Sequence, residues 1–272
     1  MASSPNRAPK SFATFANWRE LSNPTSVSPY KRPYHQRLAR VIDRLDSARL
    51  RECGALFGGG TLISLVLGEF RVSRDLDFLC PVGEGYRRLR QLVDEQGAQG
   101  LFQNTEGVGL PRPARADQYG VRFPIAFEGE LIKLEIFCEA RIALDPPENV
   151  PGLSVGCLST GDRFAEKLLA NADRWADDSI EARDLIDLAM MRRKGPIPHA
   201  AVAKAAAAYE VEPALKRALE AFGRRPGFRA RCIEALEIHP PHLSDLYEGL
   251  NLLAGDLGLP RLEGVGNVTV RF

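Results

Sequence analysis

Three acidic residues stand in a pattern that suits a divalent cation. In "SRDLDF", Asp75 and Asp77 are separated by one residue, so on a strand both side chains leave the same face. In "IKLEIF", Glu135 is flanked by apolar residues on an expected inner strand, where a lone acid requires a partner. If the two strands are neighbours, three carboxylates converge. Oxygen ligands without His or Cys favour Mg²⁺, so the sequence predicts a magnesium site.

A glycine-rich segment precedes these acids. Gly59 and Gly60 stand at the start of an apolar run with helical character, where backbone N–H groups can approach phosphate oxygens closely. Thr61 adds a hydroxyl donor. An ordinary strand-to-helix turn would use the same glycines, so this motif alone leaves that alternative open. The order and spacing of the glycines and the acids together favour a phosphate site beside the metal.

The second half of the chain adds charged residues on helical patterns. Lys167 lies at the boundary of an amphipathic helix, although a solvated surface lysine would look the same. Asp184 and Asp187 lie one turn apart and share a helix face. Basic runs at 192–194 and 217–231 indicate either solvated helix faces or a patch that holds RNA phosphates.

The elements that must position these residues follow from periodicity. Residues 1–33 are rich in Ser, Pro and basic residues, which indicates an extended arm. Alternating patterns and turn residues predict strands and helices over 34–158, including a hairpin closed at Glu128–Gly129 and a strand in "LSVGCLS". Residues 159–272 are almost entirely helical in pattern. The expected architecture is an α+β domain at 34–158 followed by an all-α domain at 159–272.

Composition narrows the function classes. The net charge of +1 over 272 residues argues against nucleic-acid attraction by the whole molecule, so any such contact must be a local patch. Five cysteines without CxxC spacing argue against a structural zinc site or disulfides and favour the cytoplasm. The sequence lacks a signal-peptide core and an apolar run of about 20 residues. We therefore expect a cytoplasmic protein without a membrane partner.

The two halves together resemble a known family. "FGGGTLISLVLGEFRVSRDLDF" resembles the hG[G/S]…Dh[D/E]h motif of the DNA polymerase β-like nucleotidyltransferases. With "LSTGDRFAEKLLANADRW…EARDLIDLAMM", it is similar to the AbiEii family, toxins of abortive-infection and toxin–antitoxin systems. The resemblance covers roughly residues 35–195. It implies a nucleotidyltransferase-fold mixed sheet with flanking helices, followed by a helical bundle.

The resemblance also implies roles for individual residues. It implies that Asp75, Asp77 and Glu135 bind Mg²⁺ and act in catalysis, with Glu replacing the commoner Asp at the third position. It further implies that a set of polar and glycine residues binds the nucleoside triphosphate, with Lys167 also catalytic. These are Gly59, Gly60, Thr61, Ser73, Lys167, Asp184 and Asp187.

The implied activity is the transfer of a nucleoside monophosphate from a nucleoside triphosphate to a macromolecular acceptor. That acceptor is either the 3′ end of a tRNA or a protein hydroxyl, and a cognate antitoxin would restrain the enzyme. Two alternatives remain open at this stage. One is a small-molecule acceptor, as in antibiotic-modifying nucleotidyltransferases, and the other is a non-catalytic nucleotide- or RNA-binding relative.

Overall fold

The computed structural model describes residues 28–262. Most of the expected arm over residues 1–33 lies outside this range. The strands are β1 Leu56–Phe57, β2 Leu76–Pro81, β3 Val108–Gly109, β4 Arg115–Ala116, β5 Gly120–Phe127 and β6 Glu130–Glu139. The helices are α1 Pro33–Ile42, α2 Ser47–Glu52, α3 Gly59–Val66, α4 Glu84–Gln96, α5 Thr160–Arg174, α6 Arg183–Lys194, α7 His199–Ala206, α8 Glu212–Arg224, α9 Pro226–Ala235 and α10 Pro240–Asp256.

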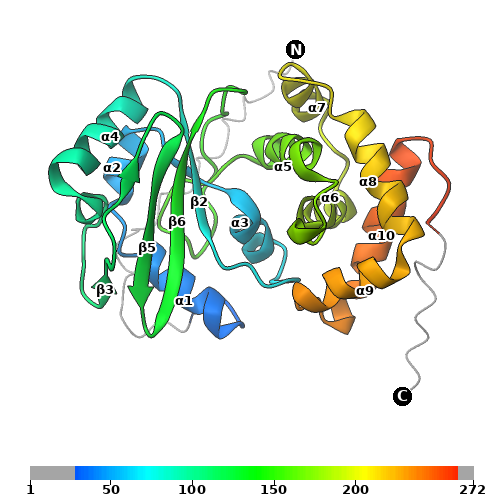
Figure 1. Ribbon diagram of the computed structural model, residues 1–272, viewed down its shortest axis with the longest axis horizontal. Helices are drawn as coiled ribbons and strands as arrows, with labels where there is room; N and C mark the ends of the chain where they lie inside the picture. Colours follow the sequence, from blue (N-terminus) through cyan, green and yellow to red (C-terminus); the bar gives the residue numbers. More distant parts are fainter. Residues whose placement is uncertain (1–27, 263–272) are drawn as a thin grey trace, which may run out of the picture.

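The strands form one mixed sheet of the order β1-β2-β6-β5-β3, with β4 paired to β5 (Figure 1). The β2–β6 pair is parallel, and the other pairs are antiparallel. The β5–β6 hairpin closes at Glu128 and Gly129, whose φ angles are 47° and 79°. Two consecutive left-handed residues suit the twist of a two-residue hairpin. The hairpin predicted at these residues is thus confirmed.

The parallel pair at the centre of the sheet carries two of the predicted acids. Leu76 and Phe78 point into the core and are fully buried, while Asp77 between them leaves the opposite face. In the strand register, Asp77 stands directly beside Glu135 of β6. The alternation that the sequence predicts for "DLDF" and "LEIF" is therefore the one that the sheet adopts.

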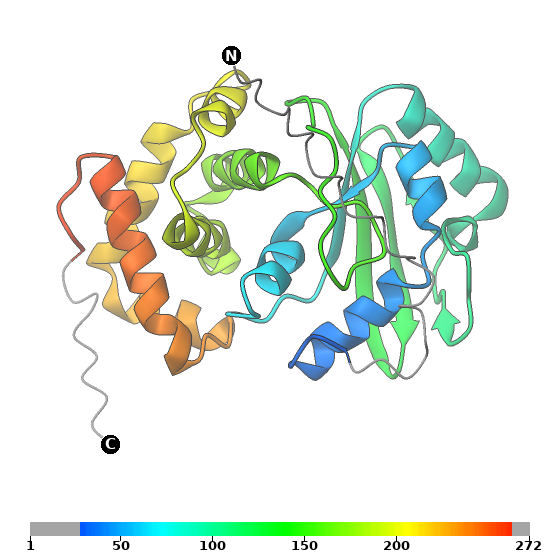
Figure 2. The ribbon, with the colours of Figure 1, turned by 180° about the vertical axis from the view of Figure 1, so that it is seen from behind.

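Two hydrophobic cores occupy the described part of the chain. One lies between the sheet and α1, α2 and α4, and the other lies among α5 to α10. Helix α3 lies between the sheet and the α5–α6 pair (Figures 1 and 2). It supplies Leu62 and Leu65 to the first core and Ile63 to the second, because its apolar residues surround the helix axis.

The α+β architecture with a mixed sheet and following helices is as predicted. We propose that the two units divide near residue 158, as the sequence indicates, with α3 serving both cores. Within residues 28–262, no helix combines the length and apolar character needed to cross a membrane.

One local expectation was wrong. The segment "LSVGCLS" forms only single bridges from Cys157 to Phe57 and Glu148 rather than a strand. Nearby prolines, including Pro147 and Pro151, lack the N–H groups that a longer ladder would use. Helices α1 and α2 are separate, and Asp46 caps the second helix by accepting from the Arg49 N–H at 3.0 Å.

Candidate active site

The glycine turn connects β1 to α3 at the edge of a cavity. Gly59 has a φ of +66°, and a Cβ there would collide with Asp77 Oδ2 and lie 2.7 Å from Asp77 Cβ. A Cβ on Gly60 would collide with the Arg71 guanidinium. The turn therefore needs glycine at both positions, because one acidic and one basic side chain pack directly on its backbone.

Thr61 and Ser73 connect the helix to the approach of β2. Thr61 Oγ1 lies 2.5 Å from the carbonyl oxygen of Asp75, to which it donates, and 2.9 Å from Ser73 Oγ. Because Thr61 is only 1% exposed, this hydroxyl holds the chain before Asp75 in place. The Ser73 N–H donates to Nε2 of the buried His35, whose Nδ1 faces Glu69 at 2.9 Å. Ser73 itself faces the cavity.

Asp75 and Asp77 carry charge that the surrounding side chains compensate only in part, through Lys167 and Lys133. Burial raises the pKa of Asp77 to about 6, and the negative charges of Asp75 and Glu135 add to that rise. Among residues 28–262, no side chain forms a hydrogen bond or ion pair with either aspartate carboxylate. Their oxygens are thus free toward the cavity. Two adjacent free carboxylates fit the donor set of a hard divalent cation.

Glu135 is held differently from the two aspartates. It is 8% exposed and forms ion pairs with Lys133 and with Arg122, the latter at 3.3 Å. Over the described range, no three His, Cys, Asp or Glu side chains form a ready metal cage. Asp75, Asp77 and Glu135 therefore form no such group in this arrangement, although all three line one cavity. To bind an ion together with the aspartates, Glu135 would have to exchange a cationic side chain for that ion.

A buried ionic network forms the opposite wall of the cavity. Lys167 Nζ lies 2.8 Å from both Asp184 Oδ1 and Asp187 Oδ2. Arg71 binds Asp187 through Nε at 2.7 Å and Nη2 at 2.9 Å, and Arg174 binds Asp184 through Nε at 2.7 Å. Three cations thus surround two acids, which leaves this wall with a positive charge. Burial raises the pKa of Asp184, but Lys167 and Arg174 outweigh it and hold that pKa far below its usual range.

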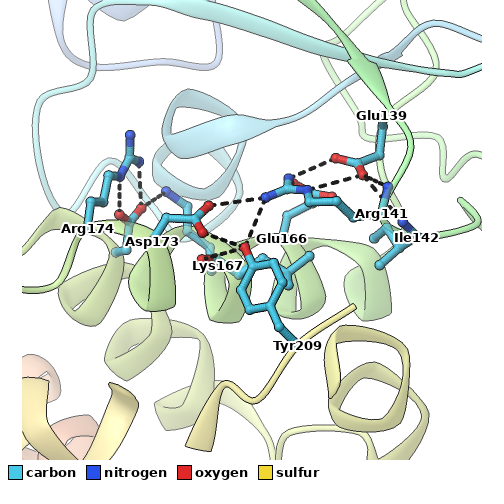
Figure 3. A network of polar contacts seen from close by, with 10 residues as sticks. Glu139, Arg141, Ile142, Glu166, Lys167, Asp173, Arg174 and Tyr209 are labelled. Carbon is cyan, nitrogen blue, oxygen red and sulfur yellow. Dashed lines mark hydrogen bonds and ion pairs between the residues drawn. The ribbon is translucent and has the colours of Figure 1, made fainter. Parts of the chain in front are cut away.

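A second network surrounds Arg141 beside α5 (Figure 3). Arg141 Nη2 lies 2.8 Å from Glu139 and 3.0 Å from Glu166, and Nη1 lies 3.3 Å from Asp173. The Tyr209 hydroxyl donates to Asp173 at 2.5 Å. Burial, followed by the charge of Glu139, raises the pKa of Glu166 to about 8. This network connects the end of β6 to α5 and to the segment between α7 and α8, at the rim of the cavity.

These walls enclose a cavity of about 550 Å³. It brings together seven of the residues predicted for the site, namely Gly59, Gly60, Ser73, Asp75, Asp77, Glu135 and Lys167. Thr61, Asp184 and Asp187 do not line it. They lie behind the wall, where they hold the residues that do.

Several cavity residues were missing from the sequence prediction. They are Arg71, Glu139, Arg141, Glu166, Asp173, Arg174 and Arg183. Two of them had a signal in the sequence. Arg71 lies two positions before Ser73, and Arg174 lies two helical turns after Lys167 on the same face of α5. Arg141 had none, because its partners come from three separate elements.

An acid pair beside a glycine turn, facing a cationic wall, suits the chemistry of a nucleotidyltransferase. The family model "Nucleotidyl transferase AbiEii toxin, Type IV TA system" matches residues 40–251. The chain belongs to this family of nucleotidyltransferases, as its two motifs predict. A search of curated proteins gave no match.

Solved structures show a looser likeness. JHP933 from Helicobacter pylori is 18% identical, with 82% of this chain and 92% of that chain covered at a TM-score of 0.45. An antigenic nucleotidyltransferase-like protein from Paracoccidioides brasiliensis is 15% identical, with 74% and 93% covered at a TM-score of 0.35. The Megavirus polyadenylate synthase is 9% identical, with 76% and 37% covered at a TM-score of 0.27. At these TM-scores, the family match and the site geometry carry the functional argument instead.

Proposed function

We propose that this protein transfers a nucleoside monophosphate from a Mg²⁺-bound nucleoside triphosphate to a hydroxyl of a macromolecular acceptor. The acceptor hydroxyl belongs to the 3′ end of a tRNA or to a protein. The observation that carries the proposal is the pair of free carboxylates on Asp75 and Asp77, which share one cavity with the buried cation of Lys167. Anionic phosphates bridged by a metal need both kinds of group.

The acidic and the basic side chains of the cavity have different roles. Asp75, Asp77 and Glu135 would hold Mg²⁺, which neutralises phosphate charge and acidifies the acceptor hydroxyl when bound. The backbone N–H groups of the Gly59–Gly60 turn face the phosphates, with the Ser73 hydroxyl beside them.

Lys167 and Arg71 supply positive charge from the opposite wall. Asp184 and Asp187 position these two cations and are not proposed to touch the phosphates themselves. Catalysis then rests on placement and charge, because no residue of the cavity needs to form a covalent intermediate. The acceptor hydroxyl releases its proton to water as its oxygen bonds to the α-phosphorus, the bond from that phosphorus to the oxygen that bridges it to the β-phosphorus breaks, and pyrophosphate leaves.

The test follows labelled nucleotide into acceptor fractions. Purified protein, Mg²⁺ and each α-³²P nucleoside triphosphate are incubated with cell extract, which is then separated into RNA, protein and small solutes. We expect label in RNA or protein, loss of transfer in Asp77→Asn, and unchanged transfer in Asp94→Asn, an exposed acid on α4. Label in small solutes would support the antibiotic-type alternative. Nucleotide binding without pyrophosphate release would support the non-catalytic alternative.

We also propose the toxin role and a cognate antitoxin, for which the family match is the support. Expression of the chain should arrest growth, and the product of a neighbouring gene should relieve that arrest. The Asp77→Asn variant should be harmless at equal protein level. If that variant is equally toxic, growth arrest does not arise from nucleotide transfer.

A further inference from the structure

A second, smaller cavity lies along α5 beyond the active-site cavity. It measures about 120 Å³ and lies between α5, α6, α8 and the start of α9. Arg174 lines both cavities, and its guanidinium is held in place by Asp184. Because Arg174 forms part of both walls, the two cavities are neighbours on either side of its guanidinium.

Asn171 presents an unpaired amide to this smaller cavity. The residue is 2% exposed, and its Nδ2 is buried without a hydrogen-bond partner. Among residues 28–262, no group forms a hydrogen bond with either end of this amide. An unpaired buried amide is costly, by about 1–3 kcal/mol. Such a group is expected to meet a polar ligand or a bound water.

The remaining walls suit a flat ring. Trp175, Phe222 and Phe228 supply aromatic surface, and Leu185 and Ile180 supply aliphatic surface. Arg225 and Arg174 are the basic residues among the lining side chains, and each is bound by an aspartate. A cavity with aromatic and aliphatic walls, one unpaired amide and charged groups that are already ion-paired is one in which a heterocycle can bury its faces and pair its polar edge.

The loop at the rim of this cavity is strained. Glu181 and Ala182 have φ values of 56° and 51°, two consecutive non-glycine residues in the left-handed region. Ala182 lines the small cavity, and the next residue, Arg183, lines the large one. Strain of this kind persists where the surroundings require a particular backbone path. Here, the backbone path places Ala182 at the small cavity and Arg183 at the large one.

We propose that the small cavity receives the base of the nucleotide and that Asn171 selects that base through its amide. This inference rests on the proposed function, because it assumes that the phosphates occupy the Asp77–Lys167 cavity. An asparagine amide has one donor side and one acceptor side and can pair with the polar edge of a base. Asn171 is thus a specificity-determining residue, distinct from the metal-binding acids.

The experiment measures binding of each nucleotide without requiring turnover. ATP, GTP, CTP and UTP analogues that resist cleavage at the α-phosphate are titrated calorimetrically against the full chain in Mg²⁺. We expect one nucleotide to bind at least about tenfold more tightly than the others. Asn171→Leu should remove that preference and leave pyrophosphate binding unchanged. Gln91→Leu makes the same amide-to-leucine change on the exposed face of α4 and should change nothing.

Asn171→Asp keeps the shape of the side chain and replaces the amide donor by an acceptor, so it should change which nucleotide binds best. If Asn171→Leu does not fold, this isosteric variant decides. The proposal would be overturned if the wild type bound all four nucleotides equally, or if both variants lost affinity equally for all four. The small cavity would then be a site for ordered water only. A base preference that depends on Asn171, in a protein that transfers no label, would refute the proposed function alone.

Discussion

Asp77 on β2 lies directly beside Glu135 on β6, as register partners of a parallel strand pair. Asp75 stands two residues earlier, so three acids approach one another at the mouth of the cavity. Glu135 is paired with Lys133 and Arg122, whereas the aspartates have no partner within the described chain. The negative charges of Asp75 and Glu135 raise the pKa of Asp77, and this pKa can be measured without an assay of nucleotide transfer.

The first prediction concerns the pKa of Asp77 in metal-free protein. Burial is the larger cause of its rise to about 6, and the charges of Asp75 and Glu135 are the smaller one. Glu135→Gln removes one negative charge, so the pKa of Asp77 should fall but stay above the ordinary aspartate value of 3.8. Carboxyl ¹³C NMR titration measures both values. An unchanged pKa would mean that Glu135 does not act on this site.

The second prediction concerns stabilisation by magnesium. A cation that binds only the folded protein raises the free energy of unfolding, by about 2.7 kcal/mol at one hundred times its dissociation constant. Mg²⁺ should therefore raise the melting temperature of the wild type and not that of Asp77→Asn. Glu106→Gln, at an exposed acid, serves as the matched control and should respond as the wild type does. A response retained in Asp77→Asn would place the ion elsewhere.

The third prediction compares two glycines with similar backbone angles. Gly59 and Gly68 have φ values of +66° and +80°, so alanine costs about 1–2 kcal/mol at either position. Only at Gly59 does the added methyl group collide with Asp77, since nothing lies within 4 Å of a Cβ on Gly68. Gly59→Ala should lose transfer by at least about a hundredfold, and Gly68→Ala should keep it. Equal activities of the two folded variants would contradict this.

The fourth prediction concerns the buried pair of Arg71 and Asp187. Their side chains are 2% and 0% exposed, so Arg71→Met leaves a buried acid with Lys167 as its remaining partner. The free energy of unfolding should fall by about 3 kcal/mol. Arg192→Met removes a similar two-contact bond to Asp256, which is 40% exposed, and should cost less than about 1 kcal/mol. Urea unfolding measures both, and equal losses would argue against the burial effect.

The fifth prediction concerns the pH dependence of stability. Burial and the charge of Glu139 raise the pKa of Glu166 from 4.5 to about 8. Between these values, the folded protein holds a proton that the unfolded chain releases, so stability falls as pH rises. Glu139 has a lowered pKa and titrates below this window. Glu166→Gln should remove more than about 1 kcal/mol of the decline between pH 5 and 8. Glu212→Gln, at an exposed acid of α8, should retain the full decline in urea unfolding.

Much of the catalytic face was predictable from local pattern. Leu76 and Phe78 are apolar and had to be buried, so the intervening Asp77 had to face the other way. The hairpin at Glu128–Gly129 was predictable as well, because its turn requires left-handed backbone. These are short-range properties that a few adjacent residues specify.

The ionic walls could not be predicted in the same way. Arg71 and Asp187 are separated by 116 positions, and nothing in either neighbourhood indicates the other. Lys167 has the same local pattern whether it lies on the surface or between two acids. Glu135 was correctly placed on the face of its strand, but its ion pair with Arg122 depends on the register of β5. Pairings of this kind depend on tertiary structure alone.

The central position of β6 has a consequence for changes of chain length. This strand pairs with β2 over Leu134–Glu139 and with β5 over Glu130–Phe137, so Leu134–Phe137 are paired on both sides. A single-residue deletion before Glu135 could not preserve both registers, and it would turn that carboxylate toward the core. Within the β5–β6 hairpin, the Glu128–Gly129 turn can accept an insertion without a change of either register. Homologues that keep Glu135 should thus vary in length at the Glu128–Gly129 turn and not within β5 or β6.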